Sequence, residues 1–239
     1  MRYLILSDIH ANFAALQSVL EDADGSYDRI LNCGDLVGYG PEPNAVVDWC
    51  RTTPQIIVRG NHDKACVGLT DLEWFNPAAR ASAVWTAAQV SPANRDFLLT
   101  LPQGPVDLGS FAIFHGSPGN EDEYLMDPEA VSNVRRDFQH GLAFFGHTHL
   151  QGGFLLHRTG VHRLSGPTVI VEETAGYLIN PGSVGQPRDR DPRAAYAVFD
   201  DGQQEVVYRR VAYDVPGTYR DIISAGLPEI LGRRLYRGV

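Results

Sequence analysis

The chain has 239 residues, of which 44% are hydrophobic and 10% aromatic, so it can bury a sizeable apolar core. Its formal net charge of −9 and its lack of any Lys- or Arg-rich run argue against a stable nucleic-acid complex. No apolar stretch approaches the roughly 20 residues of a membrane helix and no leader segment is recognisable, so we expect a cytoplasmic protein without membrane contact. The 3 cysteines show no CxxC spacing, which favours reduced structural thiols.

Strands and helices alternate in the first part of the chain. Apolar runs predict strands over 3–7, 29–34 and 55–60, and helices are expected over 12–23 and 41–51. The first of these helices places Phe13, Leu16 and Leu20 on one face. Such alternation indicates βαβ units and therefore a parallel sheet.

Residues 64–103 interrupt this alternation. Helices are predicted over 72–90 and 91–101, with Ser91 as N-cap and Pro92 at the first helical position of the second. We expect a helical insertion beside the polar motifs described below.

The remainder of the chain is rich in short strands separated by Gly, Asp and Pro turns. With no linker or repeat to justify a division, one α/β domain over 1–239, with a second and more antiparallel sheet, is the simplest prediction. The strands are expected over 105–109, 110–114, 142–146, 152–158, 160–165, 168–173, 175–180, 194–200 and 204–211.

Polar side chains follow several of the apolar runs, where buried strands end and loops begin. Open α/β sheets place their chemistry at such ends. The candidates are Asp8 and His10 in LSDIH, Asp35 in NCGDL, Asn61 and His62 in RGNHD, His115 in IFHGS, and His147 and His149 in FGHTH.

The residue types suit a site with two metal ions. In extended segments, Asp8 and His10 would project from the same side, as would His147 and His149. Gly34 would let the chain turn so that Asp35 approaches Asp8, and one bridging carboxylate could hold two cations. Two carboxylates leave two divalent cations under-neutralised, which favours an anionic substrate such as a phosphate ester.

The series D-x-H, G-D, G-N-H-D, H-G and G-H-x-H over residues 8–149, with NPGSVGQPRD at 180–189, resembles the calcineurin-like metallophosphoesterase superfamily. The resemblance is to its branch of small bacterial and archaeal phosphodiesterases and phosphatases. It implies a four-layer αββα sandwich with two mixed β-sheets.

The resemblance also implies roles for individual residues. The first metal would be held by Asp8, His10, Asp35 and His149, and the second by Asp35, Asn61, His115 and His147. His62 would stabilise the phosphoryl group or protonate the leaving oxygen, with Asp63 orienting it by a hydrogen bond, while a metal-bridging hydroxide attacks phosphorus. Mn²⁺ is the first expectation for both metals, and Fe, Zn²⁺ and Ni²⁺ remain open because all donors are oxygen or nitrogen.

One departure concerns the second motif, which reads GDLVGYG where many family members have G-D-x-V-D-R-G. Gly38 and Tyr39 replace the aspartate and the phosphate-gripping arginine, which argues against a protein phosphatase. Arg188 is a candidate replacement, with Tyr39 as a second substrate-binding candidate, although a surface arginine in a polar loop is the alternative. Several further residues could shape a substrate pocket, namely Tyr39, Trp74, Phe75, Asn76 and Tyr124. The alternative for each of them is packing in the core or chance exposure.

The sequence therefore predicts a metal-dependent phosphoesterase acting on small phosphodiesters or nucleotide-type esters. A phosphomonoesterase of the same fold is an alternative. A catalytically weak protein-binding scaffold is an alternative of another class, against which the presence of both Asn61 and His62 argues.

Overall fold

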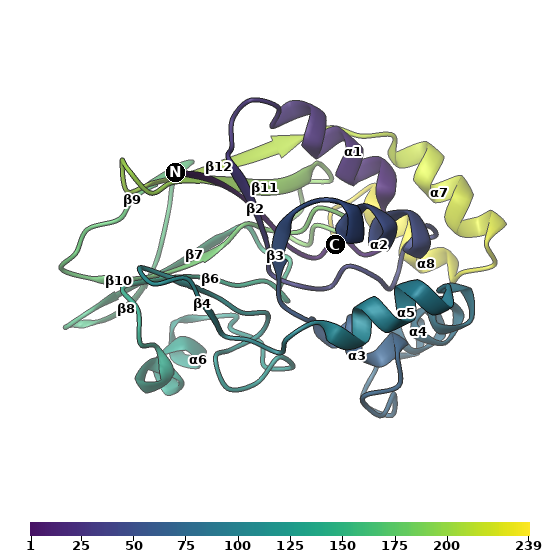
Figure 1. Cartoon of the computed structure of the whole chain (residues 1–239), viewed down its shortest axis with the longest axis horizontal. Helices are drawn as coiled ribbons and strands as arrows, with labels where there is room; N and C mark the ends of the chain where they lie inside the picture. Colours follow the sequence, from purple (N-terminus) through teal and green to yellow (C-terminus); the bar gives the residue numbers. More distant parts are fainter.

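Along β1 (Arg2–Leu6) the side chains alternate between two cores, as the two-residue period of a strand requires. Leu4 and Leu6 pack against α1 (Phe13–Asp22) and α2 (Pro43–Thr52). Ile5 faces the opposite way, into a core shared with a second sheet that includes Phe144 and Ile179. The computed structural model, which describes residues 1–239, thus has two sheets packed face to face (Figure 1).

The first sheet has six strands in the order β3-β2-β1-β11-β12-β9. Its β1, β2 and β3 are parallel, as the βαβ pattern predicts, and β11, β12 and β9 are added antiparallel. Beyond β1, these strands are β2 (Arg29–Asn32), β3 (Gln55–Ile57), β9 (Thr168–Ile170), β11 (Ala194–Asp200) and β12 (Glu205–Val211).

The second sheet also has six strands, in the order β4-β5-β6-β10-β7-β8. Its central β5, β6 and β10 are parallel and its outer pairs are antiparallel, so both sheets are mixed. The strands are β4 (Val106–Asp107), β5 (Ala112–Ile113), β6 (Leu142–Phe144), β7 (Gly152–His157), β8 (Gly160–Arg163) and β10 (Gly176–Asn180).

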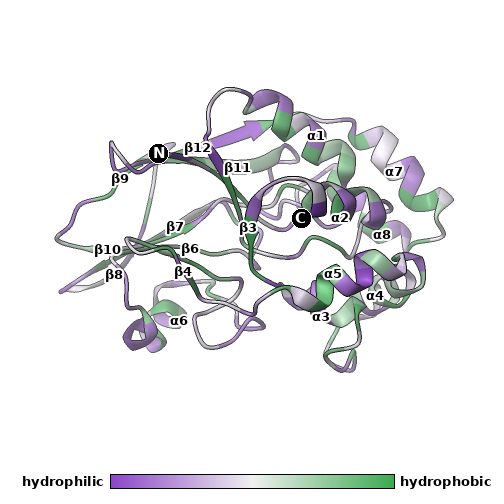
Figure 2. Ribbon diagram, viewed as in Figure 1, coloured by the Kyte–Doolittle hydropathy of each residue, from purple (hydrophilic) through white to green (hydrophobic).

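Helices cover the outer face of each sheet. On the second sheet, α6 (Pro128–Asn133) and a 3-10 turn at Arg135–Asp137 close a core that includes Phe114, Val131 and Phe145. The apolar residues, green in Figure 2, run along the strands and the inward sides of the helices. The predicted four-layer αββα sandwich with two mixed sheets is confirmed. None of the helices combines the length and apolar character that a membrane crossing requires.

The segment predicted as a helical insertion contains α4 (Pro77–Gln89) and α5 (Pro92–Thr100), preceded by α3 (Asn61–Cys66). Ser91 caps α5 as predicted, since its hydroxyl accepts a hydrogen bond from Asn94 N. The helix predicted from residue 72 begins only at Pro77, because Asn76 caps it by accepting from Ala79 N.

Several helices were not predicted. They are the short α3 and α6 and the C-terminal pair α7 (Val215–Ser224) and α8 (Glu229–Leu235). The C-terminal pair packs through Ile222 and Leu231 against Ala79 of α4 and the side chain of Tyr39. The helix that was predicted from residue 41 starts later than predicted, at Pro43.

Candidate metal centre

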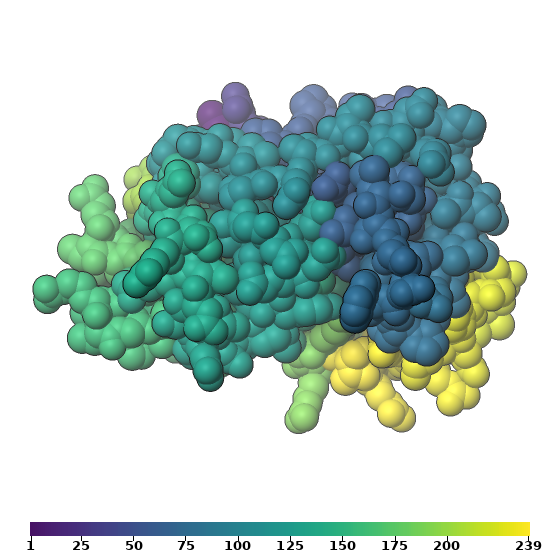
Figure 3. Space-filling view, turned by 90° about the horizontal axis from the view of Figure 1, so that it is seen from below, coloured from purple at the N-terminus to yellow at the C-terminus, as the bar shows by residue number.

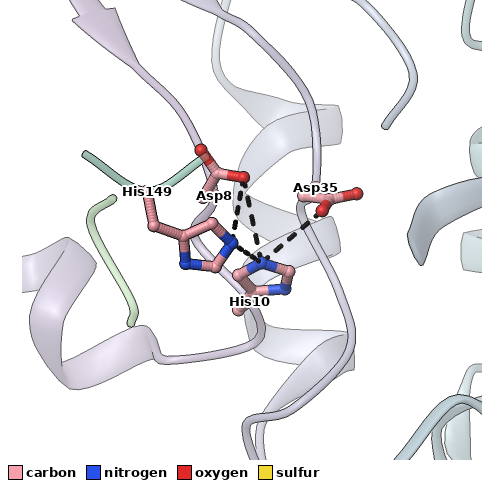
Figure 4. A group of neighbouring side chains, drawn as sticks. All are labelled: Asp8, His10, Asp35 and His149. Atoms are coloured by element: carbon pink, nitrogen blue, oxygen red, sulfur yellow. Dashed lines mark hydrogen bonds and ion pairs between the residues drawn. The ribbon is translucent and has the colours of Figure 1, made fainter. Parts of the chain in front are cut away.

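The loops that follow β1 and β2 meet those that follow β6 at one edge of the sandwich. There Asp8, His10, Asp35 and His149 place one ligand atom each within 4.8 Å of one another. The Nε2 atoms of His10 and His149 are 3.1 Å apart, and His10 Nε2 lies 3.5 Å from Asp35 Oδ2. All four side chains are buried and point toward a common centre (Figure 4).

A second cluster adjoins the first and shares Asp35 with it. Asp35, His115 and His147 place their ligand atoms within 4.8 Å of one another. His115 Nε2 lies 3.4 Å from Asp35 Oδ2 and 3.2 Å from Asn61 Oδ1, so the neutral amide joins this group. The structure therefore brings together all the residues predicted as ligands, in the two sets predicted, with Asp35 between them.

Backbone carbonyls orient three of the imidazoles. The Nδ1 atoms of His10, His115 and His149 face the carbonyl oxygens of Val37, Cys33 and Gln186 at 3.0, 2.7 and 2.6 Å. An Nδ1–H that donates to a carbonyl leaves Nε2 with its lone pair toward the centre, which is the tautomer that a metal ligand needs. Two such lone pairs at 3.1 Å, as in His10 and His149, call for a cation between them.

The carboxylates of Asp8 and Asp35 also fit a bound cation. Asp35 Oδ1 accepts a hydrogen bond from His62 N, whereas Asp35 Oδ2 and Asp8 Oδ2 are buried without a hydrogen-bond partner. Burial raises the pKa of Asp8 to about 7. Burial also opposes charge on Asp35 and His115, yet their attraction holds the pKa of Asp35 well below its usual range and raises that of His115 to about 10. Burial instead lowers the pKa values of His10 and His149 well below their usual range, so their Nε2 atoms are unprotonated beside carboxylate oxygens that lack a hydrogen-bond partner, an arrangement that fits divalent cations.

The backbone conformation differs from the extended segments that the sequence suggested. Asp8, His10, Asp35, His147 and His149 all have positive φ, between 50° and 67°. The prediction that D-x-H and H-x-H project their side chains from extended chain is therefore wrong. Each loop bends sharply out of its strand instead, and left-handed residues of this kind are strained and cluster at functional sites.

Glycine makes one of these bends possible, as predicted for Gly34. Its φ is +94°, and a Cβ there would lie 2.7 Å from Gly60 N in the neighbouring motif. The loops after β2 and β3 can approach this closely only without that carbon atom.

Asp63 does not make the hydrogen bond predicted for it. Its carboxylate accepts from the backbone N–H groups of Asp35, Leu36, Val37 and Gly60, at 2.8 to 3.2 Å. Because these bonds occupy both oxygens, the Nδ1 atom of His62 is left without a partner. Asp63 therefore holds the loop that carries the shared ligand rather than orienting His62, which corrects the predicted interaction.

His62 lies next to the first cluster, with its ring 5.0 Å from that of His10 and 4.4 Å from that of Tyr39. Burial lowers its pKa to about 4, so it is neutral near pH 7 in the absence of metal. A Cβ on Gly38 would lie 2.6 Å from His62 Nδ1. The unusual glycine of GDLVGYG thus makes room for this ring.

Arg188 and Tyr39, the candidate substrate-binding residues, lie together beside His62. The Arg188 guanidinium is 5.5 Å from the centre of the Tyr39 ring and donates to Gln186 Oε1. Tyr39 is buried, and burial raises its pKa although the Arg188 charge opposes this. Arg188 is half-buried, with its Nε unpaired, and is not the freely solvated arginine of the alternative interpretation.

The loop at 180–189 holds the ligand loops in place, a role that the sequence did not reveal. Asn180 donates to Gly146 O and to Thr148 Oγ1, and Ser183 Oγ donates to Asp8 O. Gln186 supplies the carbonyl that orients His149. The turn-rich NPGSVGQPRD motif was the available signal, but turn residues alone do not show which backbone groups a loop supports.

The remaining histidines and the cysteines lie outside the two clusters. His140 and His157 pair with Asp107 and Thr159, and neither belongs to a candidate metal group. All the cysteines are free and buried, as expected of structural thiols.

Fold and donor set together define a hydrolase that binds divalent metal, and comparison with known proteins identifies its class. The sequence pattern of the calcineurin-like phosphoesterase superfamily domain matches residues 1–203. The chain is 37% identical to the protein MJ0912 of Methanocaldococcus jannaschii, over 98% of this chain and 97% of that protein.

Two solved structures are similar to this chain over almost their whole length. A metallophosphoesterase from Sphaerobacter thermophilus is 41% identical, with a TM-score of 0.87 over 100% of this chain and 99% of that one. The hypothetical protein PH1004 from Pyrococcus horikoshii OT3 shares the fold, with a TM-score of 0.79 at 20% identity over 100% of this chain and 98% of that one. The chain belongs to the calcineurin-like phosphoesterase superfamily. It is a metallophosphoesterase, an enzyme that hydrolyses phosphate ester bonds.

Proposed function

We propose that the enzyme hydrolyses small phosphodiesters or nucleotide-type phosphate esters with two divalent cations. Asp8, His10, Asp35 and His149 would bind one cation, and Asp35, Asn61, His115 and His147 the other. The single observation that carries this proposal is the position of Asp35 Oδ2, which has no hydrogen-bond partner and lies between the two clusters, 3.5 and 3.4 Å from His10 Nε2 and His115 Nε2. We expect Mn²⁺, while the donor set also suits Fe, Zn²⁺ or Ni²⁺.

Bound divalent cations would supply a nucleophile from water near neutral pH and would neutralise phosphate charge. The chain's own residues would position the ester. Arg188 offers a guanidinium to a phosphate oxygen, held by Gln186 and lying over Tyr39. His62 lines the adjoining pocket, where its imidazole could hydrogen-bond a phosphoryl oxygen or transfer a proton to the leaving oxygen.

One observation bears on the alternatives. The donor sets are complete, which disfavours a scaffold that has lost turnover. A phosphomonoesterase would use the same donors and a similar arginine, so only turnover can separate it from a diesterase.

The test is a comparison of p-nitrophenyl phosphodiester and monoester hydrolysis by metal-loaded protein, beside Asp35→Asn and His62→Ala. We expect metal-dependent turnover that is faster on the diester and that falls at least about a hundredfold in both variants. His157→Ala, a histidine variant outside the site, should retain wild-type turnover. Absence of metal-dependent turnover on either ester would overturn the proposed function.

A further inference from the structure

A pocket of about 350 Å³ lies directly beside the metal centre. One wall is the segment around residue 70 that leads from α3 into α4, and the other is the loop around residue 122 that follows β5. In Figure 3 the surfaces of these segments, blue and teal respectively, adjoin each other. The residues that line the pocket include both Asn61 and His147 of the second donor cluster, so a ligand in it lies next to a phosphate bound there.

Aromatic side chains dominate the walls. Trp74 is 92% exposed and Tyr124 is 48% exposed, although both are large and partly apolar. Tyr124 stacks on the His147 ring at 3.7 Å between centroids, and Phe75 meets the His62 ring edge-on at 5.1 Å. A tryptophan left almost wholly in water at the rim of such a pocket has both ring faces free to stack.

The polar groups of the pocket select against further negative charge. Asp71 and Asp122 line it together with Thr70 and Asn76, and no Lys or Arg does so. Lys64 pairs with the Asp122 carboxylate from outside the lining, so the charge of Asp71 is the one without a cationic partner. Asn76 uses its side-chain oxygen to cap α4, which leaves its amide nitrogen free to donate. Carboxylates accept hydrogen bonds and repel phosphate, so the pocket suits a flat, uncharged group that carries N–H donors.

We propose that this pocket binds the nucleobase of the substrate, with Trp74 as a stacking residue that favours esters with a base over esters without one. This inference rests on the proposed function, since the phosphate must lie at the metal centre while the base enters the pocket. Every base has a π-face, so stacking on Trp74 tolerates different bases. The Asp71 carboxylate, which has no cationic partner, disfavours further phosphate groups in the same space. The volume lies at the lower end of the range for ligand pockets and suits one nucleoside rather than a longer oligonucleotide.

The test measures binding, so that it does not depend on turnover. Isothermal titration of Mn²⁺-loaded protein would compare AMP and GMP with ribose 5-phosphate, which carries a phosphate but no base. We expect both nucleotides to bind at least about tenfold more tightly in the wild type. In Trp74→Ala this ratio should fall toward one while the dissociation constant of ribose 5-phosphate stays unchanged, and Trp74→Phe should preserve most of the ratio.

Tyr236→Ala is the matched control, because Tyr236 is an aromatic residue that is 50% exposed and lies outside this pocket. It should leave the ratio unchanged. Equal dissociation constants for the three ligands in the wild type, or a ratio that survives in Trp74→Ala, would overturn the assignment of the pocket. Failure of the proposed function would show itself differently, as absent turnover on every ester.

Discussion

The two halves of the metal centre are held in different ways. In the first half, His10 and His149 are oriented by backbone carbonyls of neighbouring motif loops. In the second half, His147 has its Nε2 3.2 Å from the carbonyl oxygen of Asp122 and its ring stacked on Tyr124. His115 in the second half is also oriented by a motif loop, through the carbonyl of Cys33, so the difference between the halves lies in His147 and its dependence on the segment that contains Asp122 and Tyr124.

That segment is fixed by charged side chains of the β3–α3 region. Lys64, the only lysine in the chain, is buried and pairs with Asp122 and, at 3.0 Å, with Glu121. Arg59 makes two hydrogen bonds to the same Glu121 carboxylate. The ion pairs hold the loop against the helix that carries Asn61 and His62, so the second half can be weakened without touching any of its ligands.

The largest effect is expected from Asp35→Asn, which changes the residue that both halves share. Losing the shared carboxylate should remove at least one of two bound cations and lower turnover at least about a hundredfold. Metal analysis of purified protein beside the ester assay would measure both. Asp107→Asn, at an exposed carboxylate away from the site, is the control, and an Asp35→Asn protein with full metal content would contradict the shared role.

His149→Ala and His147→Ala should separate the halves. Each removes a ligand of one cluster, so each protein should retain about one cation and lose turnover by about a hundredfold. Calorimetric titration with Mn²⁺ should show one weakened site in either variant. If either substitution abolished both binding events, the two halves would not be separable.

Lys64→Met should act on the second half alone. Release of the loop should lower the affinity for the cation of the second half about tenfold, as the loss of groups that support metal ligands typically does. The affinity for the other cation should stay unchanged. The free energy of unfolding should fall by about 1–3 kcal/mol, because Glu121 keeps Arg59 as a partner. Arg233→Met breaks an exposed ion pair with Glu229 and should cost less than about 1 kcal/mol in chemical denaturation. An equal loss of affinity for both cations would show that the two halves of the metal centre are not held in different ways.

The smallest effect is expected from Gly38→Ala, which should alter neither half. The added methyl group would meet His62 Nδ1, so turnover should fall about tenfold with metal content intact. Gly68→Ala is the matched control. Its φ of +83° is close to the +87° of Gly38, but nothing lies within 4 Å of a Cβ there. Similar losses of turnover in both variants would indicate general backbone strain rather than displacement of His62.

The sequence predicted what depends on local pattern and motif. The alternating apolar runs identified β1, β2 and β3, and the motif series predicted that Asp8 and His149 would meet although they are far apart in the chain. The sequence did not predict the features that depend on long-range contacts. The D-x-H and H-x-H segments, which were predicted to be extended, are bent in the structure, because each must turn out of its strand toward the metal centre.

Residues that support the site were the hardest to predict. Asp63 satisfies four backbone amides, and Lys64 anchors a loop more than fifty residues away in sequence. Such partners are set by how distant loops dock, and no residue spacing encodes them. The C-terminal α7 and α8 escaped prediction for a related reason, since their shared apolar contacts lie with α4 and Tyr39.

Anomalous X-ray scattering from crystals of the Mn²⁺-loaded protein would test the shared two-metal centre directly. We expect two peaks roughly 3.5–4 Å apart on either side of Asp35. One should lie among Asp8, His10 and His149, and the other among Asn61, His115 and His147. A single peak in saturating Mn²⁺, or peaks that do not contact Asp35, would contradict the shared two-metal centre.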